Sequence, residues 1–219
     1  MIESLVPPWV AVEEAFRPDP VPELFPEEQE IVADSVERRR QEFATVRGCA
    51  RRALGRLDVG PVPILTGTDG APVWPGGTVG SMTHCAGYCA AAVARTAEVA
   101  SLGIDAEPGL PLPPGVLESV ALPGERIRLA GLADRQPDIF WDRLLFSAKE
   151  SVYKAWYPLT GRWLDFHEAD IAIDPRTRTF RAGLLVPGPV VEGRRIEAFS
   201  GNWRVGNGLV VTAITVPRC

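Results

Sequence analysis

Val99-Ala100-Ser101-Leu102-Gly103-Ile104-Asp105-Ala106-Glu107-Pro108 is the stretch of sequence that decides the fold. We expect a strand over Val99–Ala106, where small and apolar residues run together up to the acidic end. The loop that follows can be neither helix nor interior strand, because it contains Pro108, Pro111, Pro113 and Pro114. This loop predicts a boundary between two halves, residues 1–109 and 110–219.

One long helix is expected in each half. In the first half, apolar residues recur at the spacing of one helical face as far as Leu57. We expect that helix to begin at Pro26, because proline tolerates the first helical turn. In the second half, the helix is expected over about Asp138–Tyr157 and must end before Pro158.

The other segments are mostly strands. In the first half they are Val79–Thr83, Ala90–Ala94 and Val99–Ala106, of which the last two are expected to be hairpin neighbours. In the second half they are Ala169–Ile173, Phe180–Val186, Arg194–Phe199, Asn202–Val205 and Leu209–Val216. Asn207-Gly208 predicts a tight hairpin between the last two. Helices and mainly antiparallel strands in both halves predict the α+β class and suggest an internal duplication.

Charge and composition exclude several classes of protein. The net charge of −5 argues against general nucleic-acid binding. No stretch approaches the ~20 apolar residues of a membrane span, and the N-terminus lacks the basic and apolar regions of a signal peptide. We therefore expect a cytoplasmic protein that does not enter a membrane. Zinc binding at His84, Cys85 and Cys89 is not expected, because the only other histidine is the distant His167.

Three carboxylates are candidates for chemistry. Asp105 and Glu107 point to the same side of an extended segment, and Glu150 lies between Lys149 and Lys154. Together they would suit a hard divalent cation such as Mg²⁺ beside a phosphate-rich substrate. The alternative is structural: two exposed acids at a strand end, and an i, i+4 ion pair on a helix.

A second set of residues suits phosphate groups. Thr83 and His84 place a hydroxyl beside an imidazole at a strand end. Arginine is preferred for bidentate phosphate contacts, and residues 37–56 contain seven arginines, most of which must simply be solvated. The sequence has no phosphate loop, dinucleotide fingerprint or serine-hydrolase elbow, so those common classes of enzyme have no support.

Four elements in this order resemble the 4′-phosphopantetheinyl transferases. They are Gly70-Ala71-Pro72-Val73-Trp74, Thr83-His84-Cys85-Ala86-Gly87-Tyr88, Gly103-Ile104-Asp105-Ala106-Glu107 and Phe146-Ser147-Ala148-Lys149-Glu150-Ser151-Val152-Tyr153-Lys154-Ala155. The likeness is to the larger Sfp-type or EntD-type branch, and most closely to the actinobacterial enzymes that activate carrier proteins. It extends from about residue 35 to residue 216.

The resemblance implies a fold and an activity. The fold is a pseudo-twofold pair of α/β halves, with the active site and the coenzyme in the cleft between them. These enzymes transfer the 4′-phosphopantetheine group from coenzyme A to a serine of an acyl or peptidyl carrier protein and release adenosine 3′,5′-bisphosphate. They need Mg²⁺, for which Mn²⁺ could substitute. Fatty-acid, polyketide and nonribosomal-peptide carriers all remain open, and the resemblance favours a monomer.

Catalytic roles follow from the same resemblance. Asp105, Glu107 and Glu150 would hold the metal against the pyrophosphate of coenzyme A. Glu150, or a water that it orients, would take the proton of the carrier serine. Lys149 and Lys154 would offset the charge on the phosphates.

The nucleotide end of the coenzyme would be bound by other residues. These are Arg39, Arg47, Thr83 and His84. A cationic His84 would strengthen the contact with the 3′-phosphate, so binding should weaken as the pH rises through its pKa. Some relatives have a lysine where this chain has Asp69, and an acid cannot bind a phosphate, so that contact is not expected here.

Two other functions are alternatives, and the first of them could use the same carboxylates. A metal-dependent phosphohydrolase would pass the phosphoryl group to water, and a binding protein would hold coenzyme A without turnover. The presence of Asp105, Glu107, Glu150 and Lys154 argues against the binding protein, which would be free to lose them. Glu125 is a further candidate, as an auxiliary base.

Overall fold

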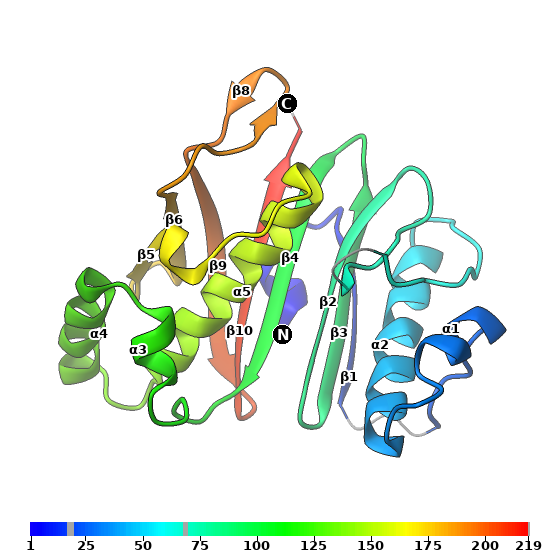
Figure 1. The fold of residues 1–219 in the computed structure, drawn as a ribbon, viewed down its shortest axis with the longest axis horizontal. Coiled ribbons are helices and arrows are strands. Elements are labelled where there is room, and N and C mark those ends of the chain that lie inside the picture. The colour runs from blue at the N-terminus through cyan, green and yellow to red at the C-terminus, as the bar shows by residue number, and fades with distance from the viewer. Residues whose placement is uncertain (17–19, 68–69, 219) are drawn as a thin grey trace.

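The structure of the chain, a computed structural model, describes residues 1–16, 20–67 and 70–218. Two antiparallel sheets lie next to each other, and one long helix packs against each of them (Figure 1). A third, two-stranded sheet is a small surface hairpin. The mixture of helices and antiparallel strands confirms the α+β class.

The smaller sheet is built from the first half of the chain. Its strands lie in the order β1 (Ala11–Phe16), β3 (Tyr88–Arg95), β2 (Thr78–Cys85). Helix α2 (Glu37–Gly55) packs on one face of this sheet through small and aliphatic side chains. Ala50 and Leu54 of α2 and Ala91 and Val93 of β3 are completely buried in this contact.

The larger sheet is built mainly from the second half. Its strands lie in the order β4 (Val99–Pro108), β10 (Leu209–Pro217), β9 (Ala198–Gly206), β6 (Thr179–Leu184), β5 (Ala169–Asp174). Helix α5 (Trp141–Thr160) packs against it, with Trp156 fully buried. Asn207 and Gly208 have φ angles of 52° and 72° and form the tight β9–β10 turn that the sequence predicts.

Strand β4 does not form the hairpin that we expected with residues 90–94. Both edges of β3 are already occupied, by β1 and by β2. β4 therefore pairs with β10, in a register that places Asp105 opposite Thr212. Its other side faces β2, where two hydroxyls replace a backbone ladder. Ser81 Oγ accepts a hydrogen bond from the Ile104 amide at 3.0 Å, and Thr83 Oγ1 accepts one from the Ala106 amide at 3.0 Å.

The first long helix of the prediction is in fact two helices. α1 (Pro26–Ile31) ends before Val32, and α2 begins only after Val36, whose backbone is extended. The break allows α1 to fold back onto α2, so that Glu28 reaches Arg51. Helix periodicity alone could not show this break, because both segments are helical.

Two other boundaries differ from the prediction. α5 continues through Pro158 to Thr160, because proline in the last turn loses only one amide and Gly161 still donates a hydrogen bond to the Tyr157 carbonyl at 2.8 Å. The segments expected as strands over 194–199 and 202–205 form the short β8 (Arg194–Arg195) and the long β9. The remaining elements are η1 (Ile2–Leu5), α3 (Val116–Val120), α4 (Pro123–Arg135), η3 (Phe166–Glu168) and β7 (Val190–Val191).

Gly103 sets how closely α5 approaches β4. A Cβ atom at this position would lie 2.0 Å from the Ser151 carbonyl oxygen, far inside any allowed contact. Only glycine permits this approach. The contact places the middle of α5 directly over the end of β4, where Asp105 and Glu107 lie.

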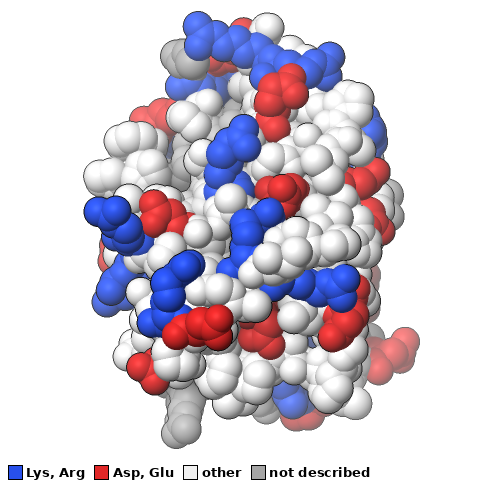
Figure 2. Space-filling view, turned by 90° about the vertical axis from the view of Figure 1, so that its left-hand side faces the viewer, with Lys and Arg blue, Asp and Glu red and all other residues white. Residues whose placement is uncertain are grey.

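The surface shows mixed charge. On the side that carries α4, basic and acidic side chains are interspersed (Figure 2). Among the described residues, no helix is both long enough and apolar enough to cross a membrane. Cys49, Cys85 and Cys89 are free thiols, whereas Cys219 lies outside the described residues.

Candidate active site

A cavity of about 640 Å³ is lined by parts of the chain that are far apart in sequence. One wall comes from the end of α1 and from α2, and another comes from β2 and the segment that precedes it. The C-terminal part of α5 closes it with Glu150, Tyr153, Lys154 and Tyr157. The cavity therefore contains residues of both sequence sets, the carboxylate set and the phosphate-binding set.

Asp105, which binds Lys154 of the cavity wall, is the best-defined of the three carboxylates. It is 4% exposed, and its Oδ1 accepts a hydrogen bond from Lys154 Nζ at 2.7 Å. Thr83 Oγ1 lies 3.4 Å from the same oxygen. Asp105 Oδ2 is buried and has no hydrogen-bond partner within the described part of the chain. Burying an oxygen without a hydrogen-bond partner costs free energy, so this atom favours a ligand that is a cation or a hydrogen-bond donor.

Glu107 and Glu150 lie in the same electrostatic environment. Burial raises the pKa of both carboxyls, and the charge of Asp105 raises both further. The Lys154 ammonium opposes this effect at both residues. Glu107 of β4 and Glu150 of α5 therefore both lie within electrostatic range of Asp105.

These residues fit a divalent cation by their chemistry. Three carboxylates that repel one another, and a buried Asp105 oxygen without a partner, are the donor set that Mg²⁺ prefers. Nevertheless, within residues 1–16, 20–67 and 70–218 no three His, Cys, Asp or Glu side chains are grouped closely enough to form a ready-made metal site. The three-carboxylate metal site therefore remains a prediction.

The Arg39–His84 pair connects the α2 wall of the cavity to the β2 wall. Arg39 NH1 is 2.7 Å from His84 Nε2, and Glu42 lies 3.6 Å from Nδ1. A nitrogen that accepts from arginine carries no proton, so the ring is neutral in this arrangement. Burial, and then the charge of Arg39, lower the pKa of His84. The cationic His84 of our sequence prediction is therefore disfavoured before an anion binds.

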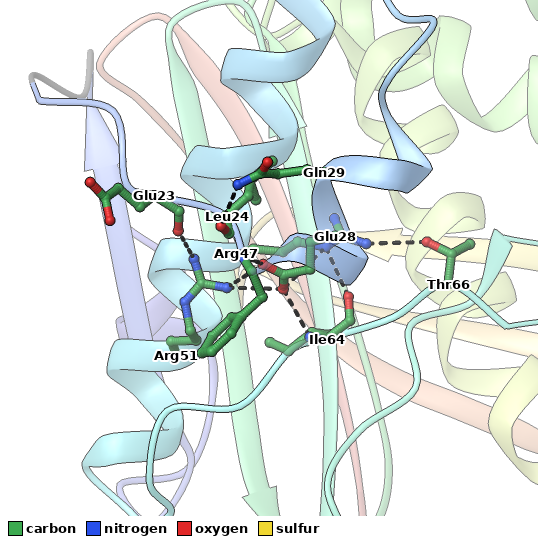
Figure 3. Close-up of polar contacts among 9 residues, drawn as sticks. Glu23, Leu24, Glu28, Gln29, Arg47, Arg51, Ile64 and Thr66 are labelled. Atoms are coloured by element: carbon green, nitrogen blue, oxygen red, sulfur yellow. Dashed lines mark hydrogen bonds and ion pairs between the residues drawn. The ribbon is translucent and has the colours of Figure 1, made fainter.

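Arg47 forms part of the cavity wall and is itself buried. Its Nε donates to the Ile64 carbonyl at 2.9 Å and its NH2 to Thr66 Oγ1 at 3.2 Å (Figure 3). Burial lowers the pKa of the guanidinium to about 10. Glu28 lies 3.8 Å away, and it binds Arg51 through both carboxylate oxygens (Figure 3). Arg47 therefore supplies positive charge to the cavity from a fixed position.

Thr83 lies beneath the cavity surface, between the two sheets. It is 4% exposed, and its hydroxyl contacts Asp105 and the Ala106 amide. Its neighbours Met82 and His84 line the cavity. Thr83 thus supports Asp105 in this structure, and its predicted contact with the nucleotide remains a prediction. Asp69 lies outside the described residues.

The structure corrects our interpretation of Lys149. Its ammonium donates to the Phe166 carbonyl at 2.6 Å and to the Ala169 carbonyl at 2.8 Å, and it pairs with Glu125 at 3.0 Å. These contacts use the three donors of an ammonium group. Burial lowers its pKa. A side chain that is 3% exposed and fully engaged has nothing left for a phosphate.

Glu125 has a structural position as well. It is 1% exposed and accepts hydrogen bonds from the amides of Leu122 at 2.7 Å and Ile171 at 2.7 Å. With Lys149 as a third partner, its carboxylate is fully coordinated by the protein. This arrangement gives no support to a role as auxiliary base.

A smaller cavity of about 120 Å³ adjoins the first one. Both cavities share Glu150 and Tyr153 in their walls. Aromatic and aliphatic side chains make most of the rest, including Trp163 and Phe166, and the Trp163 ring lies 4.9 Å from the ring of Tyr153. The sequence reasoning missed this cavity, because Trp163 and Phe166 belong to a loop and a short helix without a recognisable motif.

Sequence reasoning also missed Glu28 and Arg143. Glu28 is completely buried at the centre of the α1–α2 contact, and Arg143 pairs with Glu107 at 2.8 Å. One signal could have found Glu28. Phe25-Pro26-Glu27-Glu28 has the same pattern as Leu122-Pro123-Gly124-Glu125, an apolar residue, a proline and a glutamate two positions later.

Comparison with known proteins identifies the family. A family model described as the 4′-phosphopantetheinyl transferase N-terminal domain matches residues 27–94, and one described as the 4′-phosphopantetheinyl transferase superfamily matches residues 101–207. 4′-Phosphopantetheinyl transferase Svp of Streptomyces mobaraensis is 64% identical over 99% of this chain and 89% of that protein.

Two further relatives extend the comparison. 4′-Phosphopantetheinyl transferase PptT of Mycobacterium tuberculosis (strain ATCC 25618 / H37Rv) is 45% identical over 99% of this chain and 98% of that protein. Enterobactin synthase component D of Salmonella typhi is 34% identical, but over only 54% of this chain and 49% of that protein.

Proposed function

The chain belongs to the 4′-phosphopantetheinyl transferase superfamily, and from this premise we propose how its own residues carry out the transfer. The enzyme moves the 4′-phosphopantetheine group from coenzyme A to a carrier protein. The carrier serine oxygen forms a bond to the phosphorus that bears the pantetheine. The bond from this phosphorus to the bridging oxygen breaks, and adenosine 3′,5′-bisphosphate leaves.

The observation that carries the proposed mechanism is the contact of β4 with α5 through Asp105 and Lys154, of which Lys154 lines the large cavity. Lys154 binds Asp105 at 2.7 Å, and Glu150 lies on the same wall, one helical turn earlier. The Lys154 ammonium can offset pyrophosphate charge directly, whereas the carboxylates could do so only through a metal cation that they hold. The Lys154 ammonium is 26% exposed, so it can reach a phosphate oxygen, which the buried Lys149 cannot.

The two cavities suit the two ends of coenzyme A. We assign the nucleotide end to the larger one, where Arg39, Arg47 and His84 line the wall and would face its phosphates. The pantetheine arm is a narrow chain with few charges, and the smaller cavity has mostly apolar walls. Because Glu150 and Tyr153 belong to both cavities, the reacting phosphorus would lie beside Glu150.

Asp105, Glu107 and Glu150 are the residues that would hold Mg²⁺ or Mn²⁺. When bound, the ion would neutralise pyrophosphate charge and polarise the phosphorus towards attack. The buried Asp105 oxygen without a partner and the raised pKa values of Glu107 and Glu150 support this assignment. A nearby cation would lower both pKa values and keep the carboxylates ionised.

Glu150 is the base that we propose for the carrier serine, directly or through an oriented water. A carboxylate beside the reacting phosphorus is placed to accept the proton that the serine loses on attack. Glu107 is tied to Arg143 and Asp105 to Lys154, which leaves Glu150 as the carboxylate with the greatest freedom to accept a proton.

The two halves of the fold have corresponding parts, and we propose that they are related by a pseudo-twofold axis with the active site between them. Each half places a short helix, α1 or α4, before its long helix, α2 or α5. Each short helix begins with an apolar residue, proline and a buried glutamate that binds a basic residue of the long helix. These parallels support a division near the proline-rich loop, at residues 109 and 110.

Acyl and peptidyl carrier proteins of fatty-acid, polyketide or nonribosomal-peptide synthesis are the proposed acceptors. The relatives named as 4′-phosphopantetheinyl transferases and the relative named enterobactin synthase component D support this choice. Action as a monomer in the cytoplasm, without nucleic acid or membrane as partner, remains a prediction from the sequence.

The proposal is tested by incubation with coenzyme A, Mg²⁺ and an unmodified carrier, followed by intact-mass measurement of the carrier and quantification of adenosine 3′,5′-bisphosphate. We expect equal amounts of modified carrier and released nucleotide. Release of nucleotide without modification of the carrier would instead identify a phosphohydrolase. Binding of coenzyme A without either product would identify a binding protein.

Glu150→Gln tests the assignment of the base. We expect turnover to fall by about a thousandfold, which is within the range for loss of a general base. The matched control is Glu168→Gln, a partly exposed glutamate of η3 whose side chain closes a local cap. Equal turnover in the Glu150 variant and the wild type would remove Glu150 from the mechanism.

A further inference from the structure

Arg143 has no role in the mechanism described so far, although it contacts a predicted metal ligand. It lies in the first turn of α5. Each of its three guanidinium nitrogens donates a hydrogen bond. NH1 donates to Glu107 Oε2 at 2.8 Å, Nε to the Leu110 carbonyl at 2.9 Å and NH2 to the Pro111 carbonyl at 2.8 Å.

This cluster is held rigidly. The side chains of Arg143 and Glu107 are only 13% and 20% exposed. The neighbouring Asp142 accepts a hydrogen bond from the Leu112 amide at 2.8 Å. The first turn of α5 therefore fixes the proline-rich loop directly after β4, and a charge-assisted pair in this setting is stronger than an exposed one.

The geometry leaves one oxygen of Glu107 available. Arg143 occupies Oε2, whereas Oε1 receives no hydrogen bond from any residue that the structure describes. Arg143 and Glu150 are seven residues apart on one helix, so they lie on the same face about two turns apart. A single rigid helix thus sets the position of Glu150 and, through Arg143, the orientation of Glu107.

We propose that Arg143 is a positioning residue that presents Glu107 to the divalent cation. The inference rests on the proposed function, since it requires Glu107 to be a metal ligand. Arg143 itself contacts neither the coenzyme nor the cation. Its hydrogen bond to Oε2 fixes the orientation of the Glu107 carboxylate, in the way that outer partners orient the ligands of metal sites.

The test compares Arg143→Gln, Arg143→Lys, Glu107→Gln and the double variant Glu107→Gln/Arg143→Gln. Mn²⁺ affinity is measured by electron paramagnetic resonance with coenzyme A present and no carrier, so that no turnover occurs. We expect Arg143→Gln to weaken Mn²⁺ binding about 10- to 100-fold. Arg143→Lys should recover part of the loss, because it keeps the charge but not the fork.

The double variant separates positioning from simple structural support. If Arg143 acts through Glu107, its loss should not weaken Mn²⁺ binding further once Glu107 is already glutamine. In steady-state assays, the Mg²⁺ concentration for half-maximal transfer should rise with little change in the KM for coenzyme A. Arg126→Gln, on the exposed side of α4, is the control and should behave as wild type.

Clear outcomes would overturn the proposal. One such outcome is wild-type Mn²⁺ affinity in Arg143→Gln. The other is that Arg143→Gln lowers Mn²⁺ affinity as much in the Glu107→Gln background as in the wild type. Either result would mean that Arg143 only holds the proline-rich loop. Urea unfolding identifies any variant that is not folded, and Arg143→Lys then provides the comparison. If the wild type transfers nothing to carriers, the proposed function fails, whereas a wild type that transfers normally confines the failure to Arg143.

Discussion

The starts of α1 and α4 are built on the same plan in two different halves of the molecule. Phe25-Pro26-Glu27-Glu28 and Leu122-Pro123-Gly124-Glu125 both place proline at the first helical position and a buried glutamate two residues later. In each case the glutamate accepts the amide of the residue before the proline and an amide of a distant segment, Ile64 or Ile171.

The difference lies in the cation that each glutamate binds. Glu28 binds the guanidinium of Arg51 with Arg47 beside it, whereas Glu125 binds the ammonium of Lys149. Arg47 reaches beyond the Glu28–Arg51 pair to the wall of the large cavity. The Lys149 ammonium, in contrast, uses all its donors within the protein. The same local architecture thus supplies charge to the cavity in the first half and only fixes the fold in the second.

Glu28→Gln should produce the largest loss of stability. The substitution leaves buried guanidinium charge without its carboxylate, and breaking a buried pair in this way costs about 3–5 kcal/mol. Arginine cannot escape the cost by losing its proton. The free energy of unfolding is measured by urea titration. Glu27→Gln, on the exposed adjacent residue, should change it little.

The same substitution should also weaken coenzyme A binding, because Arg47 and Arg51 lose their common partner. Stability within 1 kcal/mol of wild type would contradict the view that Glu28 organises the wall. A large loss of stability with unchanged coenzyme affinity would show that the wall is held by other contacts, and would remove the contrast with Glu125.

Glu125→Gln should cost less, and the cost should depend on pH. Burial already lowers the pKa of Lys149, and removal of the carboxylate lowers it further. Neutralising a lysine at pH 7 costs up to about 4.6 kcal/mol, and at pH 9 only about 1.9 kcal/mol. We therefore expect a deficit of about 3 kcal/mol near pH 7 that shrinks as the pH rises.

The sign follows from proton binding. Between the lowered pKa in the folded variant and the ordinary pKa of lysine, the unfolded chain binds more protons, so stability increases with pH. Urea titrations at pH 7, 8 and 9 measure the trend, with Asp134→Asn on exposed α4 as the control. A deficit that is constant over this range would mean that Lys149 stays charged without Glu125.

Gly103→Ala tests the joint between the halves. The new Cβ would lie 2.0 Å from the Ser151 carbonyl oxygen, so α5 must move away from β4. Overpacking of this kind typically costs about 1–3 kcal/mol. Lys154 and Glu150 would shift relative to Asp105, and transfer should fall by about a hundredfold, as expected for a misplaced catalytic group.

Gly131→Ala is the matched control, because no atom lies within 4 Å of a Cβ built there in α4. That change should stabilise the chain by about 0.5–1 kcal/mol. Normal transfer by Gly103→Ala would show that the contact between α5 and β4 does not set the position of the catalytic residues.

The fold could be predicted from sequence wherever one local signal decided it. The proline-rich loop, the Asn207-Gly208 turn and most strands follow from residue type and periodicity. The pairing of β4 could not be predicted, because its apolar sequence would suit a position beside either β3 or β10. Only the structure shows that both edges of β3 are occupied, which leaves β10 as the partner. The break between α1 and α2 depends on burying Glu28, which is a tertiary effect.

For the candidate site as well, local sequence patterns could be predicted and tertiary contacts could not. Alternation along β4 correctly places Asp105 and Glu107 on one side, and the helix places Lys154 near them. Helix spacing turns Lys149 by about 100° from Glu150, but only the coordinates show that this side of α5 buries its ammonium against Glu125. Arg143 carries no motif at all, and only coordinates show its contact with Glu107.

The smallest expected effect concerns His84. Burial and the charge of Arg39 lower its pKa below the ordinary 6.5, so the free protein holds it neutral at pH 7. A bound 3′-phosphate would raise this pKa, and binding would then take up a proton. Affinity for coenzyme A should therefore increase several-fold as the pH falls from about 8 to 6.

The 3′-phosphate is the group that distinguishes this effect from general changes of charge. 3′-Dephospho-coenzyme A should show no such pH dependence, and His84→Gln should remove it from coenzyme A binding, as measured by titration calorimetry. Glu42 faces the other ring nitrogen, so Glu42→Gln should weaken the effect by lowering the pKa further. If the pH dependence persists in His84→Gln, another group is responsible for it. The Arg39–His84 pair would then have only a structural role, as Lys149 has in the second half.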